Sequence, residues 1–373
     1  MAAAIVLAVI TAAGAGITGA TTAPSPTTVR TDAIAWLAPQ VTDEGALISD
    51  YTGTPDPSLT AQALLGLAAS GADSATVAKM LGYLEANVDD FVAPDGAADS
   101  AGALSWLLLD AVVTDTDAGD FGGVDLVSRL EATQQSDGLF GNGDPSYDGT
   151  FRQALALTAL HAVGVANPAG VDWLASQQCA DGGFVAYRAD VSMRCPAVDP
   201  ANFVGADTNS TAFAAIALHL AGETTAADAA LVWLESVRTS GGGFAYLGDP
   251  SLEQDANSTG LVALAFRTLR GVDDAGSVAA LASLQVPRSG DPLDRGGIAF
   301  QSGDALYPDL MATTQAILGL TGQAMPFEPV PSVLPPTPST TTSPSSSTTV
   351  PKGAGGAAAP VATPVSAAPA YTG

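Results

Sequence analysis

The sequence predicts an all-α protein in which six helix pairs close into a ring. Three observations support this prediction: Ala/Leu-rich helical segments recur six times, a Gly-Gly-Phe or Gly-Leu-Phe turn precedes several of them, and an Asp stands where each opens. These aspartates, spaced by 43 to 59 residues, are Asp56, Asp99, Asp148, Asp207, Asp255 and Asp309. That spacing is typical of helical repeats. Because a helix pair cannot bury its apolar face alone, the units must stack, and six units without an obvious polar capping repeat favour a closed ring over an open solenoid.

The fourth repeat shows the predicted unit most clearly. An outer helix containing Trp173 ends at Gln178, and the Asp-Gly-Gly that follows permits a positive φ. The chain can therefore turn sharply and place Phe184 at the interface between repeats. The inner helix then opens at Asp207, reads DTNSTAFAAIALHLAG and stops at Gly222. Its small residues suit a helix packed on nearly every face.

The other repeats follow the same order, some of them weakly. Two good copies read WLESVRTSGGGF before DANSTGLVALAF and RLEATQQSDGLF before DGTFRQALALTALHAVG. Weaker copies read AWLAPQVTDEGAL before DPSLTAQALLGLAASG, YLEANVDDFVAPDG before DSAGALSWLLLD, and finally PDLMATTQAILGLTG. Together they place the ring at residues 30–325.

The two ends of the chain differ from the repeats. Residues 1–23 hold an apolar stretch that ends in small residues, as in a secretory signal peptide, although no Lys or Arg occurs before Arg30. Residues 327–373 are rich in Pro, Ser, Thr, Ala and Gly, which predicts a disordered, extended stalk. The terminal Pro-Ala-Tyr-Thr-Gly resembles a sortase signal with one mismatch. We therefore expect an exported bacterial protein, extracellular or attached to the cell surface through a C-terminal segment.

The two cysteines, Cys179 and Cys195, lie close together in the fourth repeat. In an exported protein they most simply form a disulfide, because oxidising compartments preserve such bonds. A zinc site lacks ligands, since the only histidines, His161 and His219, are each embedded in an Ala/Leu helix. We expect no metal and no other cofactor.

The charge of the chain excludes some classes of partner. Acidic residues number 38 against 12 basic residues, which gives a net charge of −26 and a pI near 4.1. Such a field repels nucleic acid and anionic lipid. The excess of acid also has a simpler explanation in solubility, so it does not identify a function.

The Gln-x(2–5)-Gly-aromatic turn, repeated between helices, resembles the QW-type repeats of the terpenoid cyclase and protein prenyltransferase superfamily. That resemblance implies an α6/α6 toroid over residues 32–323. The Asp207–Ala212 segment, Asp-Thr-Asn-Ser-Thr-Ala, resembles the inner-helix start of squalene cyclases and also that of the cobalamin carriers. The carriers add a β-rich second domain, which we do not expect from this sequence.

The resemblance does not extend to the catalytic residues. Cyclases protonate their substrate with the middle acid of Asp-x-Asp-Asp-Thr-Ala, and here Asn209 and Ser210 replace the two later carboxylates. An amide cannot donate that proton. The segment from Asp255 repeats the change, with Asn257 and Ser258. The zinc trio of prenyltransferases and the Gly-Cys-Gly-Glu-Gln of thioester proteins are absent as well.

The six helix starts remain as the candidate site. Asp, Asn and Ser at these positions are first of all helix caps. If the inner helices run parallel, their starts converge on one mouth of the ring, where the same groups could bind a ligand or a protein partner. The predicted ligand-binding residues are Asp148, Asp207, Asn209, Ser210, Asp255, Asn257, Ser258 and Asp309. We expect a non-catalytic binding protein. The alternative is a cyclase-like, prenyltransferase-like or glycan-active enzyme with a non-standard catalytic acid. A glycan-active enzyme of this kind would need two facing carboxylates.

Overall fold

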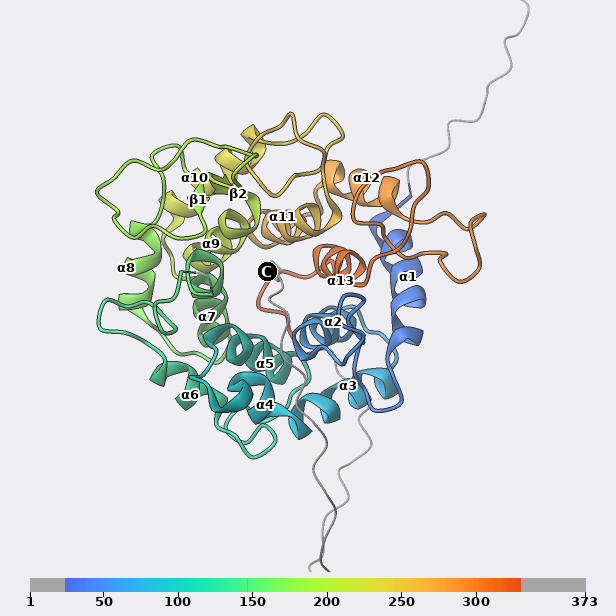
Figure 1. Ribbon diagram of the computed structural model, residues 1–373, viewed down its shortest axis with the longest axis horizontal. Helices are drawn as coiled ribbons and strands as arrows, with labels where there is room; N and C mark the ends of the chain where they lie inside the picture. The colour runs from blue at the N-terminus through green and yellow to red at the C-terminus, as the bar shows by residue number, and fades with distance from the viewer. Residues whose placement is uncertain (1–23, 146, 330–373) are drawn as a thin grey trace, which may run out of the picture.

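The computed structural model describes residues 24–145 and 147–329 of the chain, and it is a ring of helix pairs (Figure 1). The predicted signal peptide, and the stalk from residue 330 onward, lie outside the described residues. The inner helices are α2 (Pro57–Ala69), α5 (Ala101–Val113), α7 (Thr150–Ala162), α9 (Thr208–Leu220), α11 (Ala256–Arg270) and α13 (Leu310–Gly319). The outer helices are α1 (Pro26–Leu37), α3 (Ser74–Ala86), α6 (Leu126–Ala132), α8 (Pro168–Ser176), α10 (Thr224–Ser236) and α12 (Ala275–Leu284).

Short elements complete the fold. They are α4 (Val88–Val92), two 3₁₀ turns at Ala38–Gln40 and Pro94–Gly96, and the antiparallel pair β1 (Phe184–Val185) and β2 (Ala206–Asp207), in which Phe184 lies opposite Asp207. The fold is therefore the predicted all-α toroid. In the described part of the chain, no helix is long and apolar enough to cross a membrane.

The ring closes between its last and first repeats. Helix α13 packs against α2, and α1 packs against both α12 and α13 (Figure 1). The Gln285 side chain donates a hydrogen bond to the Val29 carbonyl at 2.8 Å, and Arg288 forms a 2.7 Å salt bridge with Asp32. These contacts join residues more than 250 positions apart, so the ring is closed as the repeat count predicted.

In three repeats, a Gln just after the outer helix links that helix to the next one around the ring. Gln178 donates from Nε2 to the carbonyl of Gly182 in its own turn, at 3.0 Å, and to that of Ala226 in α10, at 2.9 Å. Gln285 makes the same pair of contacts, to the carbonyls of Gly296 and of Val29 in α1, and Gln134 donates to the Gly138 carbonyl and to the side-chain oxygen of Asn167, the N-cap of α8. The repeated Gln is therefore structural: one amide fastens the turn and the neighbouring outer helix together.

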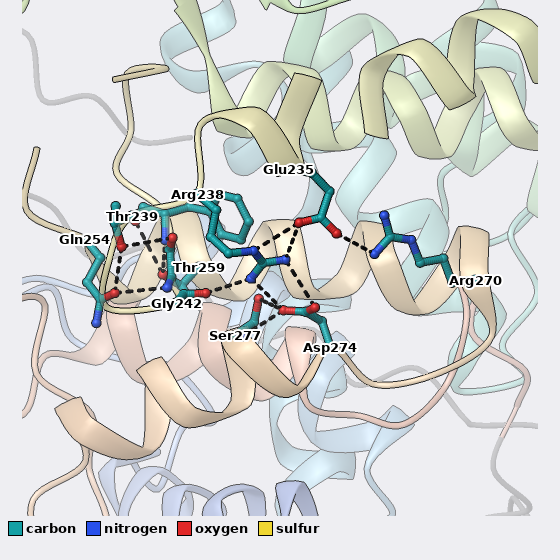
Figure 2. A network of polar contacts seen from close by, with 11 residues as sticks. Glu235, Arg238, Thr239, Gly242, Gln254, Thr259, Arg270, Asp274 and Ser277 are labelled. Atoms are coloured by element: carbon teal, nitrogen blue, oxygen red, sulfur yellow. Dashed lines mark hydrogen bonds and ion pairs between the residues drawn. The ribbon is translucent and has the colours of Figure 1, made fainter. Parts of the chain in front are cut away.

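In the fifth repeat, Arg238 takes the place of this Gln, and Figure 2 shows the resulting network. Its guanidinium donates to the Gly242 carbonyl at 2.7 Å and to Asp274, the N-cap of α12, at 2.8 Å. Glu235 accepts from Arg238 and from Arg270. In this repeat an ion-pair network therefore joins the turn to the next outer helix, as the Gln side-chain amide does in other repeats.

The glycines of these turns allow a close approach that a side chain would prevent. Gly182 has a φ of +99°, and a Cβ there would lie 2.4 Å from the carbonyl oxygen of Ala229 in the next outer helix. Only Gly adopts this conformation without strain and leaves that space free. The Asp-Gly-Gly pattern is therefore a packing requirement of the outer ring.

Inner helices are buried on nearly every face because they lie between the outer helices and the centre of the ring. An aromatic cluster fills part of that centre: Phe213 of α9 contacts Phe151 of α7, with ring centroids 4.5 Å apart, and Trp106 of α5, at 6.1 Å. Since α7 lies between α5 and α9, the contact from Trp106 to Phe213 crosses the lumen.

The chain after α13 covers the opposite end of the ring. Gln323 donates to the Ala69 carbonyl at the end of α2, at 2.6 Å, and the Met325 N–H donates to Thr268, near the end of α11, at 3.0 Å. Met325 and Phe327 are buried in the core. Packing of the toroid therefore extends to Phe327.

The predicted disulfide is present. A disulfide joins Cys179, which lies between α8 and β1, to Cys195, which lies between β1 and β2. Cys179 is buried in the core, and Cys195 packs against it. The bond therefore ties the long loop of the fourth repeat to the ring.

Candidate functional site

The inner helices all begin at one end of the ring, which we call the N-terminal mouth. The first N–H of three of them donates to a carbonyl in the loop of the following repeat: Thr150 to Ala186, Thr208 to Tyr246 and Ala256 to Phe300. Each of those loops leads into the next inner helix. Neighbouring inner helices therefore run parallel and start side by side, as the sequence predicted.

Four of the six inner helices are capped by the predicted Asp. Each carboxylate accepts the N–H three residues later at 2.7–3.0 Å: Asp56 from Leu59, Asp207 from Ser210, Asp255 from Ser258 and Asp309 from Ala312. The side chain thus satisfies an N–H that has no partner within the helix. Ser258 adds a hydroxyl contact to Asp255 at 2.9 Å.

The other two inner helices depart from the predicted pattern. Ser100, one residue after Asp99, caps α5, and Asp99 instead accepts two hydrogen bonds from Arg129. Helix α7 has Gly149 at its N-cap and no side-chain cap. The Asp148 carboxylate accepts from three loop N–H groups, those of residues 142, 143 and 144. Asp148 therefore organises the loop before α7 rather than the helix start.

Sequence reasoning missed a second role at these helix starts. A Thr four residues after each capping Asp accepts the backbone N–H of the residue that ends the Gly turn, as Thr211 does from Phe184 at 2.9 Å. The pairs with this geometry are Thr60–Leu47, Thr211–Phe184, Thr259–Phe244 and Thr313–Ile298. The repeated pattern Asp-x-x-x-Thr could have predicted this contact, because the Asp caps the inner helix and the Thr binds the Gly turn that precedes it.

Two of the caps are deeply buried carboxyls. Burial raises the pKa of Asp207 to about 7, although hydrogen bonds from Ser210 and Asn209 lower it, and burial likewise raises the pKa of Asp255 to about 6. Asp207 Oδ2 has no hydrogen-bond partner among the described residues. Both side chains lie beneath the loops of the following repeats, at 1% and 3% exposure. They therefore lack direct access to solvent at the mouth.

The surface that is open at the mouth comes from the second residue of the inner helices. This position is half-exposed in five of the six helices, while the positions that follow are largely buried. We call these five residues the mouth floor: Ser58, Phe151, Asn209, Asn257 and Met311. Phe213 lies one turn after Asn209 on the same helix and reaches across the lumen, so Asn209 also lies on the lumen side of α9.

The mouth floor holds hydroxyl, aromatic, amide and thioether groups. Asn209 and Asn257 occupy the place of the proton-donating acid in the cyclase motif that the sequence resembles. Asn257 Oδ1 is buried and has no hydrogen-bond partner within the described chain. The floor can therefore donate and accept hydrogen bonds, but its side chains include no carboxyl group for general acid catalysis.

Around the floor, the loops that precede the inner helices expose large side chains. Tyr51, Tyr147, Phe203, Phe300 and Tyr307 are between 44% and 88% exposed. All five lie in loops that lead into inner helices, so the exposed aromatic groups concentrate toward this end. Exposed aromatics in several adjoining loops are typical of contact surfaces. The composition of the chain shows only that aromatic residues are few, not that the exposed ones lie in these loops.

The predicted site residues therefore fall into two groups. Asn209, Asn257 and Asp309 are half-exposed at the mouth, whereas Asp148, Asp207, Ser210, Asp255 and Ser258 are buried, all except Asp148 as caps or partners of a cap. No group of three or more His, Cys, Asp or Glu side chains in the described residues is placed to hold a metal ion. A ligand can reach the first group without rearrangement of the fold.

One further carboxyl was missed entirely. Asp110 lies in α5, one turn after Trp106, with no exposure, and neither of its carboxyl oxygens has a hydrogen-bond partner among the described residues. Burial raises its pKa well above the ordinary value, so the group is held in its neutral form. In the sequence, Asp110 is visible only as an acidic residue after an apolar run, and that pattern does not show whether the carboxyl is buried.

Substitutions at the caps separate a structural role from a binding role. Asp207→Ala and Asp255→Ala should each lower the free energy of unfolding by about 1 kcal/mol, because one helix N–H loses its acceptor. The Ser variants keep an acceptor and should melt at or near the wild-type temperature in thermal unfolding followed by circular dichroism. If Ser proves as harmful as Ala, the carboxylate has a contact besides the cap.

Comparison with solved structures supports the fold. The type II terpene cyclase MstE from Scytonema is 16% identical, covers 80% of this chain and 97% of its own, and superposes with a TM-score of 0.57. This chain has the α/α toroid fold. An unsaturated glucuronyl hydrolase specific for heparin (14% identity, 80% and 96% coverage, TM-score 0.54) and an α-1,6-mannanase from Salegentibacter (14%, 80% and 98%, 0.53) share the toroid. No protein-family model and no curated protein matches the sequence.

These neighbours share the toroid fold with this chain, and their low identity shows nothing beyond the fold. Their reactions differ, which shows that one ring supports unrelated chemistry. Function must therefore be argued from the side chains at the N-terminal mouth of this toroid.

Proposed function

We propose that this protein is an exported binding protein that holds a ligand or a protein partner at its N-terminal mouth without converting it. The observation that carries the proposal is the chemistry of the mouth floor. Its half-exposed positions include two amides where the related motif has acids, and the nearby carboxyls of Asp207 and Asp255 are buried as helix caps. The amide groups that can hydrogen-bond to a ligand are accessible, whereas the carboxyl groups that could protonate one are buried.

Export and surface location are part of this proposal. The disulfide between Cys179 and Cys195 fits an oxidising compartment. The acidic charge of the chain suits a protein that remains in solution outside the cell. A C-terminal segment would attach the toroid to the wall or membrane.

An enzyme with a relocated acid is the second candidate, and one observation favours it. Asp110 is a neutral, buried carboxyl one turn away from Trp106, which belongs to the aromatic cluster in the lumen. A protonated carboxyl near aromatic faces is the group that would act as an acid toward an apolar substrate. Two aromatic side chains already meet across the lumen at this level, so a substrate would have to displace them.

Native mass spectrometry of the protein purified from its own host tests the proposal. We expect an added mass on the wild type that is lost in the double variant Asn209→Leu, Asn257→Leu, because Leu has a similar volume but no hydrogen-bonding group. Both capping aspartates remain, so the variant should keep its melting temperature. An added mass that survives the double substitution would place the site elsewhere. A ligand that changes mass during incubation, and does so only with Asp110 intact, would favour the enzyme.

A further inference from the structure

Arg152 differs from the other half-buried arginines of the described chain. Those arginines all donate to carboxylates or to backbone carbonyls: Arg30, Arg129, Arg188, Arg238 and Arg267. The Arg152 guanidinium makes no hydrogen bond or salt bridge with any described residue, although the side chain is half-buried. Its Cζ lies 5.9 Å from the centroid of the Tyr147 ring, a cation–π contact. A guanidinium with no carboxylate or carbonyl acceptor keeps its hydrogen-bond donors for a ligand.

The fold makes a specific place for this side chain. Arg152 lies in the first turn of α7 and crosses onto α5, where Gly102 occupies the second helix position. A Cβ on Gly102 would lie only 3.2–3.4 Å from Cδ, Nε and Cγ of Arg152. Gly102 is the one second-position residue with no side chain, and Arg152 takes the space that such a side chain would fill. Arg152 therefore lies beside the mouth floor, at the one inner-helix start that contributes no side chain to it.

Asp148 acts electrostatically on Arg152 but forms no salt bridge with it within the described chain. The Oδ2 atom of Asp148 accepts from three loop N–H groups at 2.8–3.2 Å. Gly141 leaves room for the carboxylate, since a Cβ there would lie 2.1 Å from Asp148 Oδ1. The loop therefore positions Asp148, and burial lowers the pKa of the Arg152 guanidinium.

The two helices that flank Arg152 differ from the other inner helices at their N-caps. Helices α2, α9, α11 and α13 carry Asp at the N-cap, whereas α5 and α7 carry Ser100 and Gly149, with Asp99 and Asp148 one residue earlier. An Asp cap offsets the positive end of its helix. Asp99 already accepts from an arginine of α6 and Asp148 from loop N–H groups, so no carboxylate caps the two helix starts beside Arg152.

We propose that Arg152 binds an anionic group, a carboxylate, phosphate or sulfate, on the ligand of the N-terminal mouth. The planar guanidinium matches such groups with paired hydrogen bonds and would gain the partner that the protein does not give it. The inference rests on the proposed function, because it names the chemistry of the ligand at the same mouth. It also runs against the acidic charge of the chain, which by itself would exclude anions.

Thermal unfolding in graded acetate, phosphate and sulfate, at constant ionic strength set with chloride, tests the inference. We expect at least one anion to raise the melting temperature with saturation in the wild type, and this saturating component to be absent from Arg152→Met. Arg194→Met is the matched control, because Arg194 is exposed, makes no hydrogen bond within the described residues and carries the same charge. General salt effects on stability appear equally in all three proteins and cancel.

A second variant keeps the charge and moves it. Gly102→Ala adds a methyl group against the Arg152 side chain in a helix that tolerates Ala well, so the protein should remain folded. Displacing the guanidinium should weaken the saturating response about tenfold, as expected for the loss of a charge-assisted hydrogen bond. A response to acetate alone assigns a carboxylate, and a response to phosphate or sulfate assigns a tetrahedral anion.

Equal, unsaturating responses of the wild type and Arg152→Met to all three anions would overturn the inference. This failure is distinguishable from failure of the proposed function. If the mass added to the host-purified protein still depends on Asn209 and Asn257 while the anions do not bind, the mouth holds a neutral ligand. If the anion response is present and no mass is added, Arg152 is an anion site and the ligand was lost on purification.

Discussion

Replacing Asp110 with Asn should stabilise the protein, and increasingly so as the pH rises. Asp110 is fully buried without a hydrogen-bond partner among the described residues, so folding holds it neutral while the unfolded chain ionises it at the ordinary pKa of 3.8. A raised folded-state pKa means that the native state binds more protons. Its contribution to stability is then intact below pH 3.8 and declines as the pH rises toward the folded pKa.

The slope of this decline is fixed by linkage. Between the two pKa values, one such group costs about 1.4 kcal/mol of unfolding free energy per pH unit. Asp110→Asn is nearly isosteric and cannot ionise, so it should remove that slope. Urea unfolding of both proteins between pH 4 and pH 8 measures the difference. The buried Asp207 and Asp255, whose folded pKa values are also raised, are present in both proteins and cancel.

Asp228→Asn is the matched control. Asp228 is exposed on α10, so the same chemical change should alter stability by no more than about 0.5 kcal/mol at any pH. If Asp110→Asn behaves like this control, Asp110 has a partner that satisfies it in solution. A variant less stable than the wild type would mean that the carboxyl makes a contact essential to the ring.

Gly260→Ala should destabilise the toroid by roughly 3 kcal/mol, because it forces two inner helices apart. A Cβ on Gly260 of α11 would lie 2.3 Å from the carbonyl oxygen of Gln315 in α13, and the obstruction is backbone, which cannot rotate away. Gly319 of α13 faces Gly260 in the same manner, since a Cβ on Gly319 would lie 2.3 Å from the carbonyl oxygen of Gly260. The two glycines therefore set the closest approach within the inner ring.

Gly82→Ala provides the comparison for this variant. Gly82 is also helical, in α3, but a Cβ there meets no described atom within 4 Å. Ala should stabilise that helix by up to about 1 kcal/mol, because it reduces the conformational freedom of the unfolded chain. Chemical unfolding monitored by circular dichroism should thus give opposite signs for the same substitution. Equal effects would show that α11 and α13 are not in backbone contact.

The fold could be predicted from sequence because its determinants are local and repeated. The Asp that caps a helix, the Gly that turns the chain and the aromatic residue that follows lie within short segments, so the period of the repeat is visible without any tertiary contact. Closure of the ring followed from the number of repeats. The prediction that Asp opens all six inner helices was wrong for α5 and α7, where Ser100 and Gly149 occupy the N-cap.

The candidate site was only partly predictable. Sequence located the helix starts and identified Asn209 and Asn257 as replacements for a catalytic acid. It could not distinguish which of the polar residues there are buried as caps and which are open at the mouth. That distinction depends on loops of the following repeat, such as the segment at Tyr246, which cover one position and leave the next accessible.

By itself, therefore, the sequence determined the helical repeat, the ring, the disulfide and the absence of the usual cyclase acid. Only the tertiary structure decided which charges have partners. Arg152 packs against Gly102, 50 positions earlier, without a salt bridge to any described residue, and the pKa of Asp110 is raised because the ring encloses it. Burial and pairing of a charge depend on tertiary contacts between side chains of different repeats, and a local sequence pattern does not predict those contacts.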